Sequence, residues 1–326
     1  MSMSMEGKLN TPASSGRRTK KSKNPNALSG PANLVINIFF WLYSAACVLP
    51  LALVIIVSFT DENSILRRGY TFVPEKWSTF AYEFLFKDWQ QLVHSAEISV
   101  IVTVIGTLLS LFFMALYAYP ISRPDFPHRN FFSFFMFFTM LFNGGLVPWY
   151  LVYTRMLHLK DNIWALIIPL MISAFYIMIM RTFFANTIPG ALIESAKIDG
   201  AGELRTFIQI VLPLSLPVLA TVALFQTLGY WNDWFLSMIY ISMPNGSNLQ
   251  NVNLQYLMYK TMLDIQFITS NPTALSAITA AGGDLKIPQE SVRMAMAVVG
   301  IGPIVFAYPF FQKYFVQGLT VGAVKG

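Results

Sequence analysis

The sequence is poor in charge, cysteine and histidine, and each scarcity argues against a class of protein. Charged residues make up 12% of the 326 residues, about half of the ~25% that is typical of soluble globular domains. The composition therefore argues against a water-soluble globule. The single cysteine, Cys47, excludes an internal disulfide framework and a cysteine-based metal cluster. His94, His128 and His158 are isolated and lack the spacing of a metal motif.

Motifs for binding nucleotides and for catalysis are also missing. No Gly-x-x-x-x-Gly-Lys-Ser/Thr phosphate loop occurs, and the glycines and lysine of residues 318–326 do not have that spacing. The sequence also offers no convincing pair of a nucleophile and a base. We therefore expect a chain that binds no cofactor itself, with a membrane-embedded enzyme as the alternative from another class.

Apolar residues are abundant, at 55% of the chain with a mean hydropathy of +0.54. Roughly 20 consecutive apolar residues cross a bilayer as one helix, and six stretches come close to that length. Because backbone in lipid must satisfy its own hydrogen bonds, we expect an all-α membrane protein with six transmembrane helices. The predicted spans are residues 34–60, 98–121, 131–153, 163–180, 214–241 and 294–311.

The few charges predict the orientation of these helices. On one face lie 13 of the 22 basic residues with five acids, and on the other lie nine basic residues with ten acids. An excess of lysine and arginine marks the cytoplasmic side, so both termini are expected there. Residues 1–33 then form a disordered basic cytoplasmic tail, and the first span is an uncleaved anchor. A basic tail alone also permits nucleic-acid binding, but the alternation of charge along the chain favours membrane topology.

A patterned, charged segment at residues 181–212 lies on the predicted cytoplasmic face. Pro189 suits the first turn of a helix capped by Asn186 or Thr187, and Ala191, Ser195 and Ile198 would share one face. Gly200 and its neighbours predict a sharp turn before a second helix that runs from Glu203 to Pro213. The pattern alone fits either a docking element or an amphipathic linker at the membrane surface.

This segment resembles the EAA loop of type I ABC importer permeases. Glu194-Ser195-Ala196 matches the initial triplet, Gly200 follows after three residues, and Ile210, Leu212 and Pro213 fall at the expected positions. Ser195 for the first alanine is the one departure. The resemblance implies a type I ABC importer permease fold, in which Glu194, Ser195, Ala196, Asp199 and Gly200 belong to a coupling helix that contacts an ATP-binding subunit.

Other stretches resemble the maltose-type carbohydrate class of these permeases. The last ten residues resemble a tail that reaches between the ATPase subunits, which implies contacts for Gly322, Lys325 and Gly326. Residues 287–295 look like the stretch before the last span in carbohydrate permeases, and residues 143–148 look like the subgroup that handles oligosaccharides and polysaccharides.

The resemblance implies a complex in the bacterial cytoplasmic membrane that imports an oligosaccharide or related glycan. Its other members would be a second permease subunit, two ATP-binding subunits that hold ATP and magnesium, and an extracytoplasmic solute-binding protein. Residues 34–326 would form the permease domain, with a coupling loop at 181–212, an external loop at 242–289 and a cytoplasmic tail at 312–326. A peptide or phosphorylated cargo is the alternative within the same importer class, and no nucleic acid is expected.

Polar residues inside the spans are candidates for the substrate path. Gln226, Gly229, Tyr230 and Asp233 follow helical spacing in the fifth span, and a carboxylate within a membrane is a functional candidate by default. Asn143 interrupts the third span, where polar backbone survives only against protein or water. Our path candidates are Asn143, Tyr230, Asn232 and Asp233. A structural role for the region around Asp233, in capping or bracing helices, is the favoured alternative.

The external loop at residues 242–289 is longer than a simple connector. The maltose-type resemblance implies that it reaches a solute-binding protein near Gly282-Gly283. The alternative is a surface loop with a short helix at residues 254–262.

Overall fold

The computed structural model describes residues 30–242, 251–273, 276, 288–309 and 311–312. The chain divides into two compact units, residues 1–51 and 52–326, and the boundary falls within helix α1, Gly30–Ser58. This helix is apolar along its 29 residues and corresponds to the first predicted span. It begins a few residues before the end of the predicted tail, and residues 1–29 of that tail lie outside the described residues.

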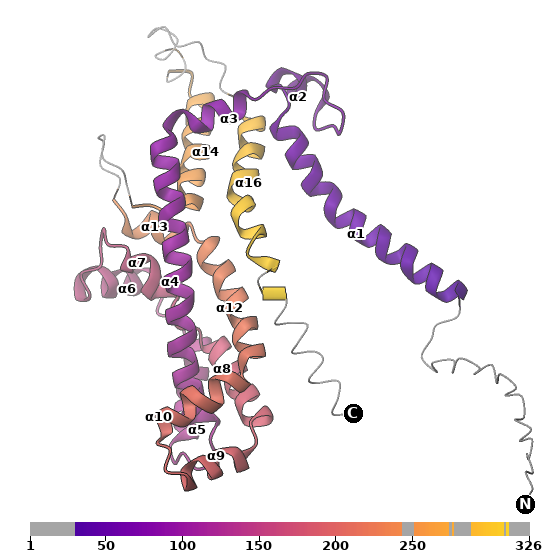
Figure 1. The fold of residues 1–326 in the computed structure, drawn as a ribbon. Helices are drawn as coiled ribbons and strands as arrows, with labels where there is room; N and C mark the ends of the chain where they lie inside the picture. Colours follow the sequence, from indigo (N-terminus) through magenta and orange to yellow (C-terminus); the bar gives the residue numbers. More distant parts are fainter. Residues whose placement is uncertain (1–29, 243–250, 274–275, 277–287, 310, 313–326) are drawn as a thin grey trace, which may run out of the picture. The chain divides into compact units, whose positions relative to one another are not determined.

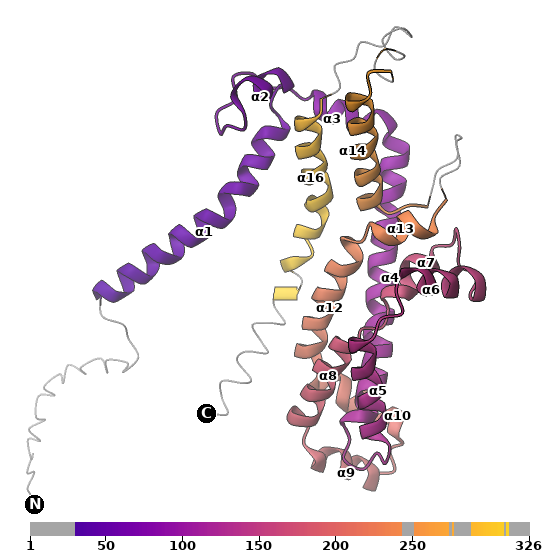
Figure 2. The same cartoon turned by 180° about the vertical axis from the view of Figure 1, so that it is seen from behind.

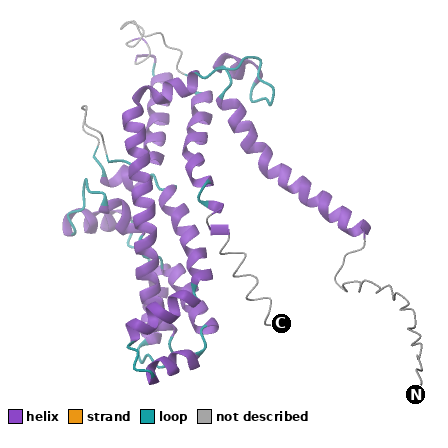
Figure 3. Ribbon diagram, viewed as in Figure 1, coloured by secondary structure: helices purple, strands orange, loops and turns teal. Residues whose placement is uncertain are grey.

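The second unit is helical, and its described residues contain no β-strand (Figure 3). An isolated β-bridge joins Thr60 to Trp77. The α-helices that lie wholly within the described part of this unit are α2 (Glu62–Arg68), α3 (Phe80–Leu85), α4 (Trp89–Ser122), α5 (Arg129–Leu141), α6 (Leu146–Leu151), α7 (Trp164–Ile167), α8 (Ala174–Thr187), α9 (Gly190–Ile198), α10 (Glu203–Thr206), α11 (Leu212–Leu214), α12 (Leu216–Trp231), α13 (Phe235–Tyr240), α14 (Leu254–Ser270) and α16 (Glu290–Val305).

The 34-residue helix α4 is the element against which the others pack. It runs beside α14 toward one end of the unit and beside α12 and α8 toward the other (Figures 1 and 2). Its buried face is rich in small side chains, which let neighbouring backbones approach closely. These buried small residues are Ser95, Ser99, Thr103, Gly106, Thr107, Ser110, Ala115 and Ala118.

Two of the predicted spans are bent pairs of helices, and a third bend lies where another predicted span begins. The third span turns by 115° between α5 and α6, and the fourth by 52° before α8. A bend of 80° separates Glu203–Leu214 from α12, at the start of the predicted fifth span. The first bend follows from Gly145, whose φ of +84° is readily adopted only by glycine. The third bend is centred on Ser215, between Pro213 and Pro217, which cannot donate backbone hydrogen bonds within a continuous helix.

The predicted number of six spans is not confirmed. Among the described residues, two helices are long and apolar enough to cross a membrane, and five candidates result if each bent pair counts as one span. The sixth predicted span corresponds to α16, whose 16 residues fall short of the roughly 20 needed to cross the hydrocarbon layer. Asp233 lies between α12 and α13, so the fifth span does not continue as one helix through this residue.

The segments predicted to be external contribute to the core. Helix α14 is a 17-residue helix, longer than the short helix weighed at residues 254–262, and it buries Leu254, Met258 and Ile265. The carboxylate of Glu62 in α2 accepts the N–H groups of Gln289, Glu290 and Ser291 at 3.0, 2.9 and 2.9 Å. It thereby supplies the cap that the start of α16 lacks from its own sequence. The Gly282-Gly283 contact predicted for the solute-binding protein lies outside the described residues.

The tightest approach of α4 to α12 predicts a sharp difference between two glycines. A Cβ on Gly106 would lie 2.6 Å from Cζ of Tyr230, and this ring cannot easily shift because its hydroxyl donates to the Ile167 carbonyl at 2.8 Å. We expect Gly106→Ala to lower the free energy of unfolding by about 1–3 kcal/mol. Gly229→Ala is the matched control on α12, since its Cβ would meet open space. Thermal unfolding in detergent tests this, and equal midpoints for the two variants would contradict it.

Candidate functional site

The candidate site is the segment around α9, which lies together with α10 at one end of the second unit (Figure 1). Ile188 precedes Pro189, and a residue before proline is disfavoured in helical conformation. Ile188 is accordingly extended, α8 ends at Thr187, and Pro189 becomes the N-cap of α9. The predicted cap at Asn186 or Thr187 was therefore wrong, because α8 continues through both residues.

A glycine-dependent hydrogen-bond pattern ends α9. The N–H of Ala201 bonds the carbonyl of Ala196 at 2.9 Å, and the N–H of Gly200 bonds the carbonyl of Lys197 at 3.1 Å. Together with the φ of +78° at Gly200, these two bonds define a Schellman motif. The sharp turn expected at Gly200 is present, and it leads within a few residues into α10, which begins at Glu203.

The two faces of α9 differ in burial. Ile193 and Ala196 are buried, and Ile193 joins the core cluster that contains Phe184 and Phe207. The predicted shared face, Ala191, Ser195 and Ile198, is exposed, and Ile198 is 87% exposed. Of the other predicted coupling residues, Glu194, Asp199 and Gly200 are exposed and Ala196 is buried. One face of the helix, which carries both apolar and polar side chains, is therefore not covered by the part of the chain that the structure describes.

Five side chains form a closed ring that joins α9 to two other parts of the molecule. The Lys197 ammonium lies 3.1 Å from Asp125 and 3.0 Å from Glu203. The Tyr119 hydroxyl donates to Glu203 at 2.9 Å. Arg123 closes the ring by donating to both oxygens of Asp125 at 2.8 and 2.7 Å and to the Tyr119 hydroxyl at 3.3 Å. We call Tyr119, Arg123, Asp125, Lys197 and Glu203 the ion ring.

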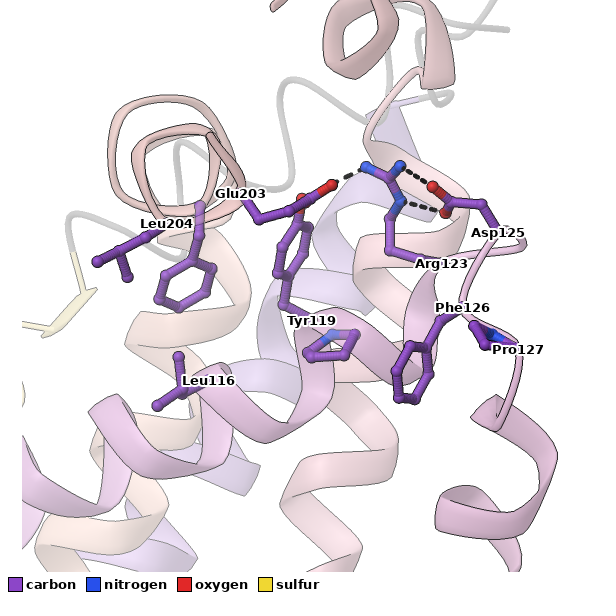
Figure 4. Close-up of a pocket in the computed structure, with 10 residues that line it drawn as sticks. Leu116, Tyr119, Arg123, Asp125, Phe126, Pro127, Glu203 and Leu204 are labelled. Atoms are coloured by element: carbon purple, nitrogen blue, oxygen red, sulfur yellow. Dashed lines mark hydrogen bonds and ion pairs between the residues drawn. The ribbon is translucent and has the colours of Figure 1, made fainter. Parts of the chain in front are cut away.

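Four members of the ion ring, Tyr119, Arg123, Asp125 and Glu203, line a hollow of about 430 Å³ (Figure 4). The hollow is otherwise apolar, with walls that include Leu116, Phe126 and Leu204. Figure 4 shows the fork of Arg123 bonded to Asp125 beside Glu203 and Tyr119.

The charges of the ion ring stabilise each other's ionised forms. The Arg123 guanidinium, followed by Lys197, holds the pKa of Asp125 well below its usual range. The hydrogen bond from Lys197 lowers the pKa of Glu203, and Glu203 and Asp125 raise the pKa of Lys197. Depressed carboxyl pKa values favour folding above about pH 4, the ordinary range, and the contribution is lost only as pH falls through the depressed values. The ring therefore stays ionised between about pH 5 and 8.

Sequence reasoning missed the ring. Nothing in the local spacing indicates Asp125, which is distant in sequence and lies between α4 and α5. The side chains of Lys197, Asp125 and Glu203 are 44%, 53% and 59% exposed. Ion pairs this exposed contribute little to folding because solvent screens them, so their main consequence is geometric.

The residues predicted for the substrate path form hydrogen bonds with other parts of the chain. Tyr230 is buried, and its hydroxyl lies 3.2 Å from Ser110 besides its bond to Ile167. Asp233 accepts the N–H of Leu236 at 3.2 Å and thereby caps α13, and its carbonyl accepts the Asn253 amide. Asn232 is the exposed C-cap of α12. Neighbouring Trp231 is buried and donates to the Gly300 carbonyl at 2.9 Å.

The break in the third span lies near the start of α13. Asn143 accepts the N–H of Gly145 at 2.8 Å, which stabilises the turn. Asn143, Trp149 and Phe235 line one hollow of about 370 Å³. The structure therefore brings Asn143 close to Phe235, which lies two positions after Asp233. The tail candidates Gly322, Lys325 and Gly326 lie outside the described residues.

The left-handed conformation of Gly200 predicts a selective effect on α9. We expect Gly200→Ala to destabilise the end of this helix by about 1 kcal/mol, whereas Gly190→Ala should be harmless because its Cβ would meet open space at an ordinary helical position. Hydrogen–deuterium exchange of peptides that cover residues 190–201 measures the difference. Faster exchange is expected only in Gly200→Ala, and equal protection in both variants would refute the role of the turn.

Comparison with known proteins identifies the family. The model of the family "Binding-protein-dependent transport system inner membrane component" matches residues 129–321. The chain is 37% identical to the polygalacturonan/rhamnogalacturonan transport system permease protein YtcP of Bacillus subtilis over 90% of its length and 98% of that protein. It is 27% identical to the arabinooligosaccharides transport system permease protein AraQ of Halalkalibacterium halodurans, over 90% and 96% of the two chains.

A solved structure has the same fold. One chain of a bacterial ABC transporter involved in the import of the acidic polysaccharide alginate superimposes with a TM-score of 0.70 at 26% identity, and the match covers 91% of this chain and all of that one. The all-α permease fold expected from sequence is confirmed by this likeness, as is the role of a transport subunit. The chain belongs to the family of inner membrane components of binding-protein-dependent transport systems.

Proposed function

We propose that this chain is one of two permease subunits of an ABC importer that carries an oligosaccharide or related glycan into a bacterial cell. The observation that carries the proposal is α9, whose exposed face bears Glu194 and Ser195 and ends in the turn at Gly200. This face belongs to the segment that resembles the EAA loop, and the charge distribution of the sequence favours a cytoplasmic position for it. Both termini would lie on that same side.

The partners follow from what the chain lacks and exposes. Its sequence has no phosphate loop, so two separate subunits would bind ATP with magnesium and seat α9. A second permease subunit would complete the pathway, and a solute-binding protein would deliver cargo outside. Closure of the ATPase subunits would then shift the helices between inward and outward states, because a ligand shifts an equilibrium by its differential affinity for the two states.

Glycan cargo is supported by the relatives. The proteins named above are described as carrying polygalacturonan/rhamnogalacturonan, arabinooligosaccharides or alginate. Aromatic side chains with amide and carboxylate groups suit sugar surfaces and hydroxyls, and we propose Asn143, Tyr230, Asn232 and Asp233 as the region of the path. The buried contacts of Tyr230 and Asp233 favour a role in shaping this region over direct contact with a sugar.

The coupling role predicts the effect of two substitutions. Glu194→Lys reverses a charge on the exposed face of α9, and Gly200→Pro is incompatible with a φ of +78°. Each should abolish transport-linked ATP hydrolysis in a purified complex while the chain still inserts into the membrane. Glu97→Lys makes the same charge change on the exposed surface of α4 and serves as the control. Retention of coupled uptake in both α9 variants would show that this segment does not couple.

The cargo is tested with the complex copurified from its host. Mass spectrometry identifies the ligand of the copurified binding protein, and ATPase activity in proteoliposomes is then measured with oligogalacturonates, alginate oligomers, arabino-oligosaccharides and a peptide mixture. We expect stimulation of about fivefold or more by at least one glycan. Stimulation by peptides alone would overturn the glycan proposal and leave the importer assignment intact.

A further inference from the structure

Helix α9 packs against the core of the second unit through few side chains. Two of its side chains, Ile193 and Ala196, are buried, and they are neighbours on one stripe of the helix. A nine-residue helix is too short to be stable by itself. A contact along one stripe holds the helix against the core, but it leaves the helix able to roll about its axis and to tilt at its C-terminal end.

Lys197 restrains this movement from two directions. Asp125 approaches from the segment between α4 and α5, and Glu203 approaches from the start of α10. Glu203 can reach back to Lys197 because the turn at Gly200 reverses the chain within a few residues. The two carboxylates are themselves fixed, one by the Arg123 fork and the other by the Tyr119 hydroxyl.

We propose that Lys197 is the positioning residue that fixes the orientation of α9 relative to α4, through Asp125 and Glu203. The inference rests on the proposed coupling function and names residues outside the matched EAA positions. Arg123 and Tyr119 belong to α4 and its C-terminal end, so the ion ring connects the exposed helix directly to the longest helix of the second unit. A displacement of α9 by a partner is then passed to α4 instead of being absorbed by rolling of α9.

The ion ring is suited to orientation more than to stability. Its four charged groups are two cations and two carboxylates, so they balance within the ring. All three groups of the Lys197 bridge are substantially exposed, and loss of such pairs changes folding little. Loss of Lys197 should consequently leave a folded, assembled chain whose α9 is less well oriented, a combination that a purely stabilising role does not produce.

Spin-label distances test the proposal without reference to transport. Labels are attached at Phe112→Cys on α4 and Ile198→Cys on α9, both exposed positions, in a Cys47→Ser background. We expect Lys197→Met to broaden the distance distribution, and Lys197→Arg, which keeps the charge, to preserve it. Lys76→Met is the matched control, because the exposed Lys76 lies 3.9 Å from Asp61, far from α9 in sequence. An unchanged distribution in Lys197→Met would overturn the proposal.

Asp125→Asn and Glu203→Gln separate the two arms of the bridge. Each removes one ionic partner of Lys197 while keeping the shape of the side chain, so each should broaden the distribution less than Lys197→Met. In the assembled complex, the ratio of cargo transported to ATP hydrolysed should fall by about fivefold or more in Lys197→Met and recover in Lys197→Arg. If the unmodified complex carries no glycan, the proposed function fails, whereas the distance measurement still decides the role of Lys197.

Discussion

The close approach of α12 to α4 at Gly106 is the constraint on which the second unit depends. The Tyr230 ring occupies the space that a Cβ on Gly106 would fill, and its hydroxyl bonds both the Ile167 carbonyl and Ser110. One aromatic side chain thus joins α4, α12 and the helical segment before α8. Nearby, Gln226 of α12 donates to Ser110 at 3.1 Å and also to the Leu170 carbonyl. Polar side chains here satisfy one another and the carbonyls at the bend before α8, as burial requires.

The same helix that provides this contact also provides one side of the ion ring. Tyr119 lies near the C-terminal end of α4, packs against Phe207 with ring centroids 5.4 Å apart, and donates to Glu203. The core cluster beneath it includes Met114, Ile177 and Val222 from α4, α8 and α12. Helix α9 therefore rests on a well-packed core on one face and is connected by ionic bonds at its end, while its other face remains exposed.

The sequence was informative where a pattern repeats locally. Apolar length predicted helices, the spacing of Glu194, Gly200 and Pro213 identified the segment that forms α9 to α11, and Gly200 was correctly placed at a turn. Interruptions of the third and fifth spans were visible as glycine and proline. The 52° bend of the fourth span was not anticipated, although Pro169 lies in the short helical turn directly before the break and is a local signal for it.

Pairings between distant segments could not be predicted from one sequence. The bond of Lys197 to Asp125 and the capping of α16 by Glu62 join residues far apart in the chain, and no local pattern indicates either pairing. Helical spacing correctly grouped the residues that form the exposed face of α9. Spacing alone does not show which face of a helix packs against the core. Asp233 was placed inside a helix because hydropathy does not reveal the helix end at Trp231.

If α9 couples ATP hydrolysis to transport, its exposed face contacts an ATP-binding subunit in the assembled transporter. Photo-crosslinking from position 195 tests it most directly, with a photoreactive amino acid replacing Ser195 in cells that express the whole system. We expect one dominant adduct, which mass spectrometry identifies as the ATP-binding subunit. Adducts with lipid alone, or with proteins that bind no ATP, would contradict it.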